Sequence, residues 1–245
     1  MLHQDREDSV PRKSFRLKSE RDAILSEFEV EYYSRQLVFR DIGYGGQVKL
    51  KSASVCIVGL GGLGSPAALQ LAAMGVGHLR LVDHDVVELS NLQRQYIYSV
   101  KFLGYPKVEA AAMRLRELNP NIEVEPLPIS INPNTIEEII KDVDVVVDGL
   151  DRMSTRYVVN RACQKLGVPY IYGAAIMSYG SVSTIIPGET PCLECFLGRI
   201  DDNMLPSCSV VGVHPAILNI IASIEVSEAT KIITGKKPKL AGKLL

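Results

Sequence analysis

A cluster of glycines near residue 60 has the spacing of a phosphate-binding turn. The run GLGGLG places Gly59, Gly61, Gly62 and Gly64 between an apolar stretch that predicts a strand and a segment that predicts a helix. Glycine permits positive φ in such a turn and removes the Cβ that would block a phosphate-bearing ligand. The following helix offers unpaired N–H groups and the positive end of its dipole. The context therefore predicts a nucleotide site, although a tight strand-to-helix packing turn uses the same residues.

Polar residues after this turn indicate which kind of nucleotide is held. Asp83 follows a second predicted strand, where a carboxylate can hold ribose hydroxyls, and a nicotinamide enzyme would use the same aspartate. Asn91 and Arg94 lie in the next segment, SNLQRQ, and Lys107 opens a predicted helix. An amide and two cations suit a triphosphate, whose charge must be held while one bond breaks. Either cation alone would be interpreted as an ordinary solvated charge.

Asp151 is the candidate metal ligand. It follows the run VDVVV and lies just beyond the carboxyl end of a predicted buried strand, where open α/β sheets bind their ligands. A carboxylate together with phosphate oxygens forms a suitable shell for Mg²⁺. The alternative interpretation is that Asp151 caps the helix expected to begin near Ser154.

Three cysteines are candidates for metal binding or thiol chemistry. Cys192 and Cys195 form a C-x-x-C pair, which supplies two of the four ligands that a tetrahedral zinc site requires. A reduced, metal-free pair is the alternative. Cys208 precedes the last predicted helix, and its thiol would need a lowered pKa to react.

The elements expected to position these residues alternate along the chain. Strands are expected at 55–58, 79–82, 122–127, 143–147 and from 170 onward, and helices at 63–74, 107–118, 135–140, 154–166 and 215–234. This alternation predicts a Rossmann-like α/β fold with a doubly wound, mostly parallel sheet. Helical spacing in 29–50 predicts an N-terminal helical segment, and the apolar run at 181–186 predicts an antiparallel C-terminal extension.

Composition limits the class of protein. The 245 residues carry 27 Lys+Arg and 28 Asp+Glu, and the net charge of −1 argues against nucleic acid or an anionic membrane as the main partner. Two stretches without charged residues, 52–79 and 204–224, have the length of membrane spans, but their glycines, prolines and polar residues favour buried soluble segments. We expect residues 1–28 to form a flexible charged tail and residues 29–245 a single domain. Scattered cysteines and an N-terminus without an apolar signal region predict a cytoplasmic protein.

Five ordered motifs resemble one enzyme family. YSRQL at 33–37 is followed by GLGGLGSP, LVDHDVVELSNLQRQ, YPKVEA and DGLD…TR. Together they resemble the ubiquitin-activating-enzyme-like adenylyltransferases over roughly residues 30–245, and most closely those that activate the sulfur carriers of molybdopterin and thiamine biosynthesis. The resemblance implies ATP- and Mg²⁺-dependent adenylylation of the C-terminal glycine carboxylate of a small β-grasp, ubiquitin-like carrier. It also implies release of pyrophosphate and a homodimer.

The same resemblance implies roles for individual residues. Gly62 corresponds to the loop glycine at the nucleotide, and Arg35 to an arginine that reaches into the neighbouring protomer's site. For Arg35 the alternative is an ordinary surface ion pair. Arg152 stands where the family usually has Asn, and we assign it no catalytic role. The remaining matches are the ribose carboxylate, the phosphate contacts and the Mg²⁺ ligand: Asp83; Asn91, Arg94 and Lys107; and Asp151.

The cysteines match the family only in part. In the relatives a second C-x-x-C near the C-terminus completes the zinc site, whereas this sequence stops at Leu245, so zinc on Cys192 and Cys195 stays open. In some relatives a cysteine at the position of Cys208 becomes linked to the activated carboxyl or carries persulfide sulfur, and in others it is dispensable.

Two other functions stay open at this level. An NAD(P)-dependent Rossmann oxidoreductase would share the glycine loop, but the sequence shows no obvious hydride-site pair and would leave Arg94 and Lys107 without a role. A catalytically inactive dimeric homologue that only binds a carrier is the other alternative. The presence of Asp83 and Asp151 together with both cations argues against it.

Overall fold

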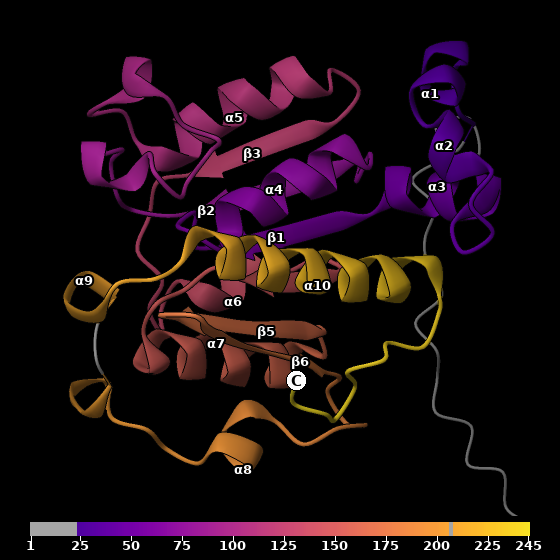
Figure 1. The fold of residues 1–245 in the computed structure, drawn as a ribbon. Helices are drawn as coiled ribbons and strands as arrows, with labels where there is room; N and C mark the ends of the chain where they lie inside the picture. Colours follow the sequence, from indigo (N-terminus) through magenta and orange to yellow (C-terminus); the bar gives the residue numbers. More distant parts are fainter. Residues whose placement is uncertain (1–23, 206–207) are drawn as a thin grey trace, which may run out of the picture.

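The computed structural model describes residues 24–205 and 208–245, without the side chains of Cys208 and Ser209, and in this part six strands form one sheet (Figure 1). The strand order is β3-β2-β1-β4-β5-β6. Strands β1 to β5 are parallel and β6 is antiparallel to β5, as the sequence predicts. The strand bounds are β1 Ser54–Val58, β2 His78–Val82, β3 Glu123–Leu127, β4 Val145–Asp148, β5 Tyr170–Ile176 and β6 Tyr179–Ile185.

Helices cover both faces of the sheet. On β1, Val55 and Ile57 belong to one apolar core, and Cys56 and Val58 belong to the other, because neighbouring side chains of a strand point to opposite faces. The first core is completed by α3 Gly43–Ser52, α4 Gly64–Ala73, α5 Lys107–Leu118 and α10 Pro215–Thr234, and the second by α6 Ile136–Ile140, α7 Met153–Leu166 and α8 Leu193–Leu197. The remaining elements are the short helix α9 Cys208–Val211 and the 3₁₀ helices η1 Leu89–Asn91, η2 Val100–Phe102 and η3 Asp202–Met204.

The N-terminal helical segment is broken into three short helices: α1 Glu27–Tyr32, α2 Ser34–Leu37 and α3. The break between the first two falls at Tyr33, which is buried and whose hydroxyl accepts a hydrogen bond from Asn119 Nδ2 (2.7 Å). Ser26 caps α1, so the folded part begins before the expected boundary at 28. Residues 1–23, most of the expected tail, lie outside the described residues.

The direction of the chain through the sheet creates a ligand-binding edge. From β1 the chain moves outward to β2 and β3, and it then returns to the other side of β1 as β4. In open α/β sheets, ligands bind beyond the carboxyl ends of the strands where the strand order reverses, here between β1 and β4. The N-terminal helices lie at the opposite, amino end, on the right in Figure 1. Within the described ranges, no helix has both the length and the apolar character needed to cross a membrane.

Candidate active site

The glycine turn after β1 is packed against the turn after β4. Gly59 has φ +88°, and a Cβ on Gly64 would lie 1.8 Å from Gly59 O. A Cβ on Gly149, just after β4, would lie 2.2 Å from the same oxygen. These three glycines therefore allow two backbones to touch, and they join the carboxyl ends of β1 and β4.

The two middle glycines of the turn face different surroundings. A Cβ on Gly62 would meet Leu218 of α10 at 2.7 Å, so this glycine lets α10 pack on the turn. A Cβ on Gly61 would have Gln95 Nε2 and Gly149 O as its nearest neighbours, each 3.9 Å away. Gly61 is thus the member of the turn whose half-buried backbone leaves room for a ligand.

Asp83 lies beside this turn at the end of β2. One carboxylate oxygen accepts a hydrogen bond from Leu60 N (2.7 Å) and the other from Asp85 N (2.9 Å). A carboxylate oxygen has a second lone pair, so Asp83 keeps acceptor capacity for a ribose hydroxyl. Asp83 is thus attached to the glycine turn, and its role at the ribose stays a prediction.

The crossover segment between β2 and α5 is anchored to the same turn. The buried Tyr98 hydroxyl donates to Leu60 O (3.0 Å), and burial raises the pKa of Tyr98, so the hydroxyl stays protonated. Asn91 is buried, and its Oδ1 accepts from Glu88 N (3.1 Å), so this amide holds the crossover itself. Half-buried Arg94 donates to Ser90 O (2.8 Å).

Gln95 is a candidate that the sequence interpretation did not single out. Its side chain is 3% exposed and lies next to Gly61, and its Oε1 has no hydrogen-bond partner within the described part of the chain. An unsatisfied buried amide oxygen is costly, so a partner is expected there. The only sequence signal is its place beside Arg94 in the SNLQRQ run.

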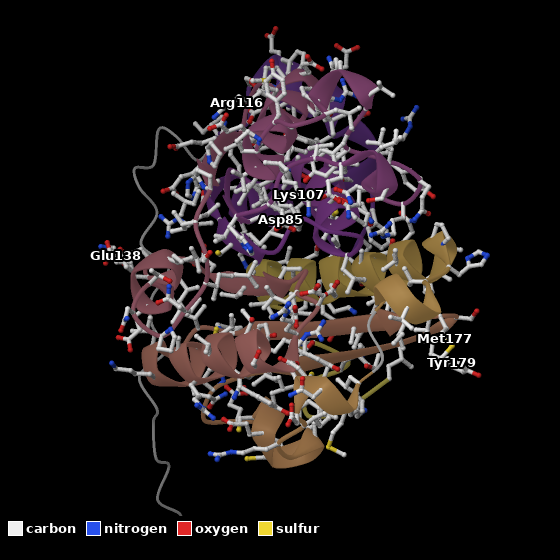
Figure 2. All side chains as sticks on the ribbon, turned by 90° about the vertical axis from the view of Figure 1, so that its left-hand side faces the viewer. Asp85, Lys107, Arg116, Glu138, Met177 and Tyr179 are labelled. Atoms are coloured by element: carbon white, nitrogen blue, oxygen red, sulfur yellow. The ribbon has the colours of Figure 1, made fainter. Side chains whose placement is uncertain are left out.

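Lys107 opens α5 and points to the same edge. It is 6% exposed, and its Nζ donates to Asp85 Oδ2 (2.7 Å). Figure 2, which looks onto the carboxyl ends of the strands, shows the two side chains next to each other. Burial alone would raise the pKa of Asp85, but the hydrogen bond and charge of Lys107 outweigh it and lower that pKa. Asp85 is therefore ionised at neutral pH.

Asp151 follows the Gly149 turn, beyond the end of β4. It is exposed, and its carboxylate accepts no hydrogen bond from any residue that the structure describes. The alternative of a helix cap is wrong, because Asp202 caps α7 instead: its carboxylate accepts from Met153 N (2.6 Å) and from Ser154 N. A free, hard carboxylate at the ligand edge fits Mg²⁺ bound together with phosphate oxygens.

Arg35 lies far from the nucleotide edge. It is an exposed residue of α2, whose Gln36 donates to Met74 O at the far end of α4. Because α4 starts at the glycine turn and has ten residues, its two ends are about 15 Å apart. Arg35 forms no ion pair with a residue in the described ranges, so the surface-ion-pair alternative has no support.

The C-x-x-C pair lies apart from the nucleotide edge. Cys192 Sγ and Cys195 Sγ are 3.2 Å apart at the start of α8. Among the described His, Cys, Asp and Glu residues, no third ligand joins them. In the described part of the chain, three potential metal ligands come within 4.8 Å of one another at Asp83, His84 and Asp85, and His84 is exposed to solvent. The thiol of Cys208 lies outside the described residues.

Comparison with known proteins confirms the resemblance inferred from the motifs. Residues 33–245 match the ThiF family, and the chain belongs to that family. SAMP-activating enzyme E1 of Haloferax volcanii is 38% identical over 222 residues, which cover 90% of this chain and 82% of that protein. The sulfur carrier protein ThiS adenylyltransferase of Bacillus subtilis is 41% identical over 208 residues, which cover 84% of this chain and 61% of that protein.

The fold comparison agrees with the sequence comparison. A crystal structure of E. coli MccB with ATP matches with a TM-score of 0.77 at 25% identity, over 87% of this chain and 66% of the MccB chain. The chain thus spans less than two thirds of the Bacillus enzyme and of MccB. Membership of this family, with relatives named as activating enzymes and adenylyltransferases, sets aside the nicotinamide oxidoreductase alternative.

Proposed function

We propose that this chain adenylylates the C-terminal glycine carboxylate of a small ubiquitin-like sulfur carrier, with ATP as the donor and pyrophosphate as the leaving group. Membership of the ThiF family, relatives named for SAMP and ThiS, and an MccB structure with ATP support this function. The observation that carries it is the meeting of the glycine turn, Lys107 and the free Asp151 at one edge of the sheet.

The reaction needs charge neutralisation more than a base. A carboxylate oxygen of the carrier attacks the α-phosphorus, a new P–O bond forms, and the bond to the pyrophosphate oxygen breaks. A chain-terminal carboxyl has a pKa of about 3.5, so the nucleophile is already ionised at pH 7. Positioning of the two reactants and stabilisation of the charge on the phosphates are therefore the tasks left to the protein.

We assign these tasks to the residues at the carboxyl edge. The backbone at Gly61, which has room beside it, would approach the phosphates, and Asp83 would accept hydrogen bonds from the ribose. Lys107, which pairs with Asp85 in this structure, and Arg94 would neutralise phosphate charge. Asp151 would hold Mg²⁺, which supplies Lewis-acid polarisation of the phosphoryl oxygens when bound.

The finer parts of the proposal concern assembly and metals. We propose a homodimer, in which Arg35 of one protomer serves the site of the other. Zinc at Cys192 and Cys195 would need two further ligands, because the pair supplies half of a tetrahedral site. A compartment that supplies ATP and keeps these thiols reduced, the cytoplasm, suits the reaction.

Carrier-dependent exchange of pyrophosphate into ATP tests this function directly. We expect exchange with at least one member of a panel of purified β-grasp proteins, and none without carrier. Asp151→Ala should abolish exchange without changing the melting temperature, since the exposed Asp151 carboxylate has no hydrogen bond or ion pair with the described residues. Asp41→Ala is the matched control, because Asp41 is an exposed aspartate that pairs with Lys236 far from the site.

Three outcomes would contradict the proposal. Stabilisation of the protein by NAD(H) but not by Mg-ATP would restore the oxidoreductase alternative. Absence of exchange with every carrier would favour an inactive, carrier-binding homologue. Near-normal exchange in Asp151→Ala would remove Asp151 from the mechanism.

A further inference from the structure

Among the side chains that the structure describes, none forms a hydrogen bond or ion pair with the carboxylate of Asp151. It is exposed, as is its neighbour Arg152, which stands at the N-cap of α7 without forming a capping bond. The direction in which Asp151 projects is therefore set by the backbone of the turn between β4 and α7. The side chains that hold this turn therefore determine the position of the Asp151 carboxylate.

A buried ion pair holds the polar groups next to Asp151. Leu150 N donates to Asp148 Oδ1 (2.8 Å), and Leu150 O, the carbonyl of the peptide bond to Asp151, accepts from Arg156 Nη2. Arg156 Nε donates in turn to Asp148 Oδ2 (2.9 Å). Asp148 is fully buried and Arg156 is 5% exposed. The pair thus forms hydrogen bonds with both the N–H and the carbonyl of Leu150.

The pair is itself fixed to the next strand. The Tyr170 hydroxyl on β5 donates to Asp148 Oδ2, and Arg156 Nη2 also donates to Gly173 O (2.8 Å). The guanidinium lies over the Tyr172 ring, 5.4 Å from its centroid. Five hydrogen bonds and one cation–π contact therefore connect the end of β4, the turn, α7 and β5. Sites supported by such rigid elements are held more closely than sites on free loops.

Stability alone does not explain a buried ion pair at this place. Removing two charges from water costs several kcal/mol per ion, and well-packed apolar residues often replace such pairs without loss. An apolar pair, however, has no donor for Leu150 O and no acceptor for Leu150 N. The distinctive property of this pair is that it fixes an irregular turn from inside the protein.

We propose that Asp148 and Arg156 are positioning residues that orient Asp151 toward a nucleotide-bound divalent cation. The proposal rests on the assignment of Asp151 as the metal ligand in the proposed function. Neither residue touches the substrate. Both act through the peptide that carries Asp151.

Arg156→Lys tests the proposal. Lysine keeps the positive charge but has a single ammonium, which cannot reach Asp148, Leu150 O and Gly173 O together. Binding of Mn²⁺ in the presence of a non-hydrolysable ATP analogue, followed by the electron paramagnetic resonance of free Mn²⁺, is the readout. We expect affinity for Mn²⁺ to fall about tenfold or more, as happens when groups that support a metal ligand are removed. Affinity for the analogue without metal should stay within about twofold of wild type, because the glycine turn is unchanged.

Two further variants make the experiment decisive. Arg161→Lys carries the same substitution on the same helix, but Arg161 is an exposed residue that pairs with Glu194, so Mn²⁺ affinity should not change. Tyr170→Phe removes only the hydroxyl bond to Asp148 and should weaken Mn²⁺ binding by a smaller factor. It keeps the test available if Arg156→Lys does not fold.

The outcomes separate this proposal from the proposed function. Wild-type Mn²⁺ affinity in folded Arg156→Lys, or in Tyr170→Phe if Arg156→Lys does not fold, overturns the positioning role. So does a lowered melting temperature with unchanged Mn²⁺ affinity, which is the signature of a merely structural role. The variants can lose Mn²⁺ affinity as expected while the wild-type protein shows no pyrophosphate exchange with any carrier. That result contradicts the proposed function and supports the positioning role.

Discussion

Glycines of one short turn have different roles, although they are identical in the sequence. Gly59 and Gly64 are required by the fold, because each allows a backbone contact that a Cβ would prevent. Gly62 accommodates Leu218 of α10. Gly61 alone has no atom within 3.9 Å of a would-be Cβ, and its φ lies outside the left-handed region. The fold therefore tolerates a side chain at Gly61, whereas a bound phosphate would not.

Alanine substitutions should separate these two roles. Gly64→Ala places a Cβ 1.8 Å from Gly59 O, so we expect it to destabilise the fold by more than about 3 kcal/mol. Gly61→Ala should change the free energy of unfolding by less than about 1 kcal/mol but weaken ATP binding about tenfold or more. Urea unfolding and titration with an ATP analogue measure the two effects. Wild-type ATP affinity in Gly61→Ala would show that this backbone does not face the nucleotide.

The sequence indicated some residues of the candidate site and missed others. Asp83, Lys107 and Asp151 could be named because each stands at a strand end or a helix start, and such ends are visible as changes in apolar periodicity. Gln95 and Arg156 end the motifs SNLQRQ and DGLD…TR, but nothing in either motif indicates that these two polar side chains are buried. Their importance arises from contacts with Gly61 and Leu150, which depend on the folded chain.

Helix α10 carries two glutamates whose pKa values are shifted in opposite directions. Glu225 is fully buried, and neither of its carboxylate oxygens has a hydrogen-bond partner among the described residues. Burial and the nearby Asp148 raise the pKa of Glu225 well above its usual value, despite the opposing charge of Arg156. Glu228, one turn later, accepts from Thr184 Oγ1 (3.0 Å) and Leu240 N (2.8 Å), in addition to its ion pair with Lys231. Burial alone would raise the pKa of Glu228, but these bonds lower it.

The two acids should give opposite dependences of stability on pH. Folded Glu225 keeps a proton that the unfolded chain releases above a pH of about 4.3, so wild-type stability falls as the pH rises above that value. Glu225→Gln cannot ionise, and its free energy of unfolding should rise relative to wild type between pH 5 and pH 8. Urea unfolding of wild type and variant at both pH values checks this. A constant difference would show that Glu225 ionises freely in the folded protein.

Glu228→Gln is the matched control on the same helix. The lowered pKa means that Glu228 stabilises the fold above its unfolded pKa, and that this contribution is lost as the pH falls through the folded pKa. We expect Glu228→Gln to lose about 1–3 kcal/mol at pH 7 and less in acid. The sign of its pH dependence is thus the reverse of that for Glu225→Gln.

Helix ends that are set by neighbouring residues were predicted correctly, whereas a helix break that is set by a distant contact was not. Helices α5 and α10 begin and end at the predicted residues. Asn119-Pro120 directly follows α5, and α10 begins at Pro215 and is followed by Gly235, so the residues that end these helices are their neighbours in the sequence. The N-terminal helices were expected as one helical segment. They are interrupted at Tyr33, which is buried against Asn119, 86 residues away in the sequence. A contact of that range leaves no trace in local periodicity.

Arg35 could reach a nucleotide site only if two copies of the chain pack together, because it lies at the other end of the sheet from the glycine turn. Arg35 lies at the amino end of the sheet, and the glycine turn lies at the carboxyl end. Helix α10 spans both ends: Leu218 packs on Gly62, and Thr234 meets α3 near Gly46. The amino-terminal half of its outward face carries no charged side chain and includes Asn219, Ile220, Ser223 and Ser227. Two copies packed about a twofold axis with antiparallel α10 helices would bring the Arg35 end of each beside the glycine turn of the other.

Mixing two inactive variants tests this arrangement. If Arg35 acts across the dimer, Arg35→Ala and Asp151→Ala are each inactive alone, but a heterodimer has one site with an intact Asp151 and the partner copy's intact arginine. Random reassortment of an equimolar mixture makes half of the dimers mixed, so exchange activity should recover to about a quarter of wild type. The measurement is pyrophosphate exchange after subunit exchange, with copurification of differently tagged chains to demonstrate the heterodimers. If Arg35 served its own protomer, no combination would contain an intact site, and mixed dimers would stay inactive.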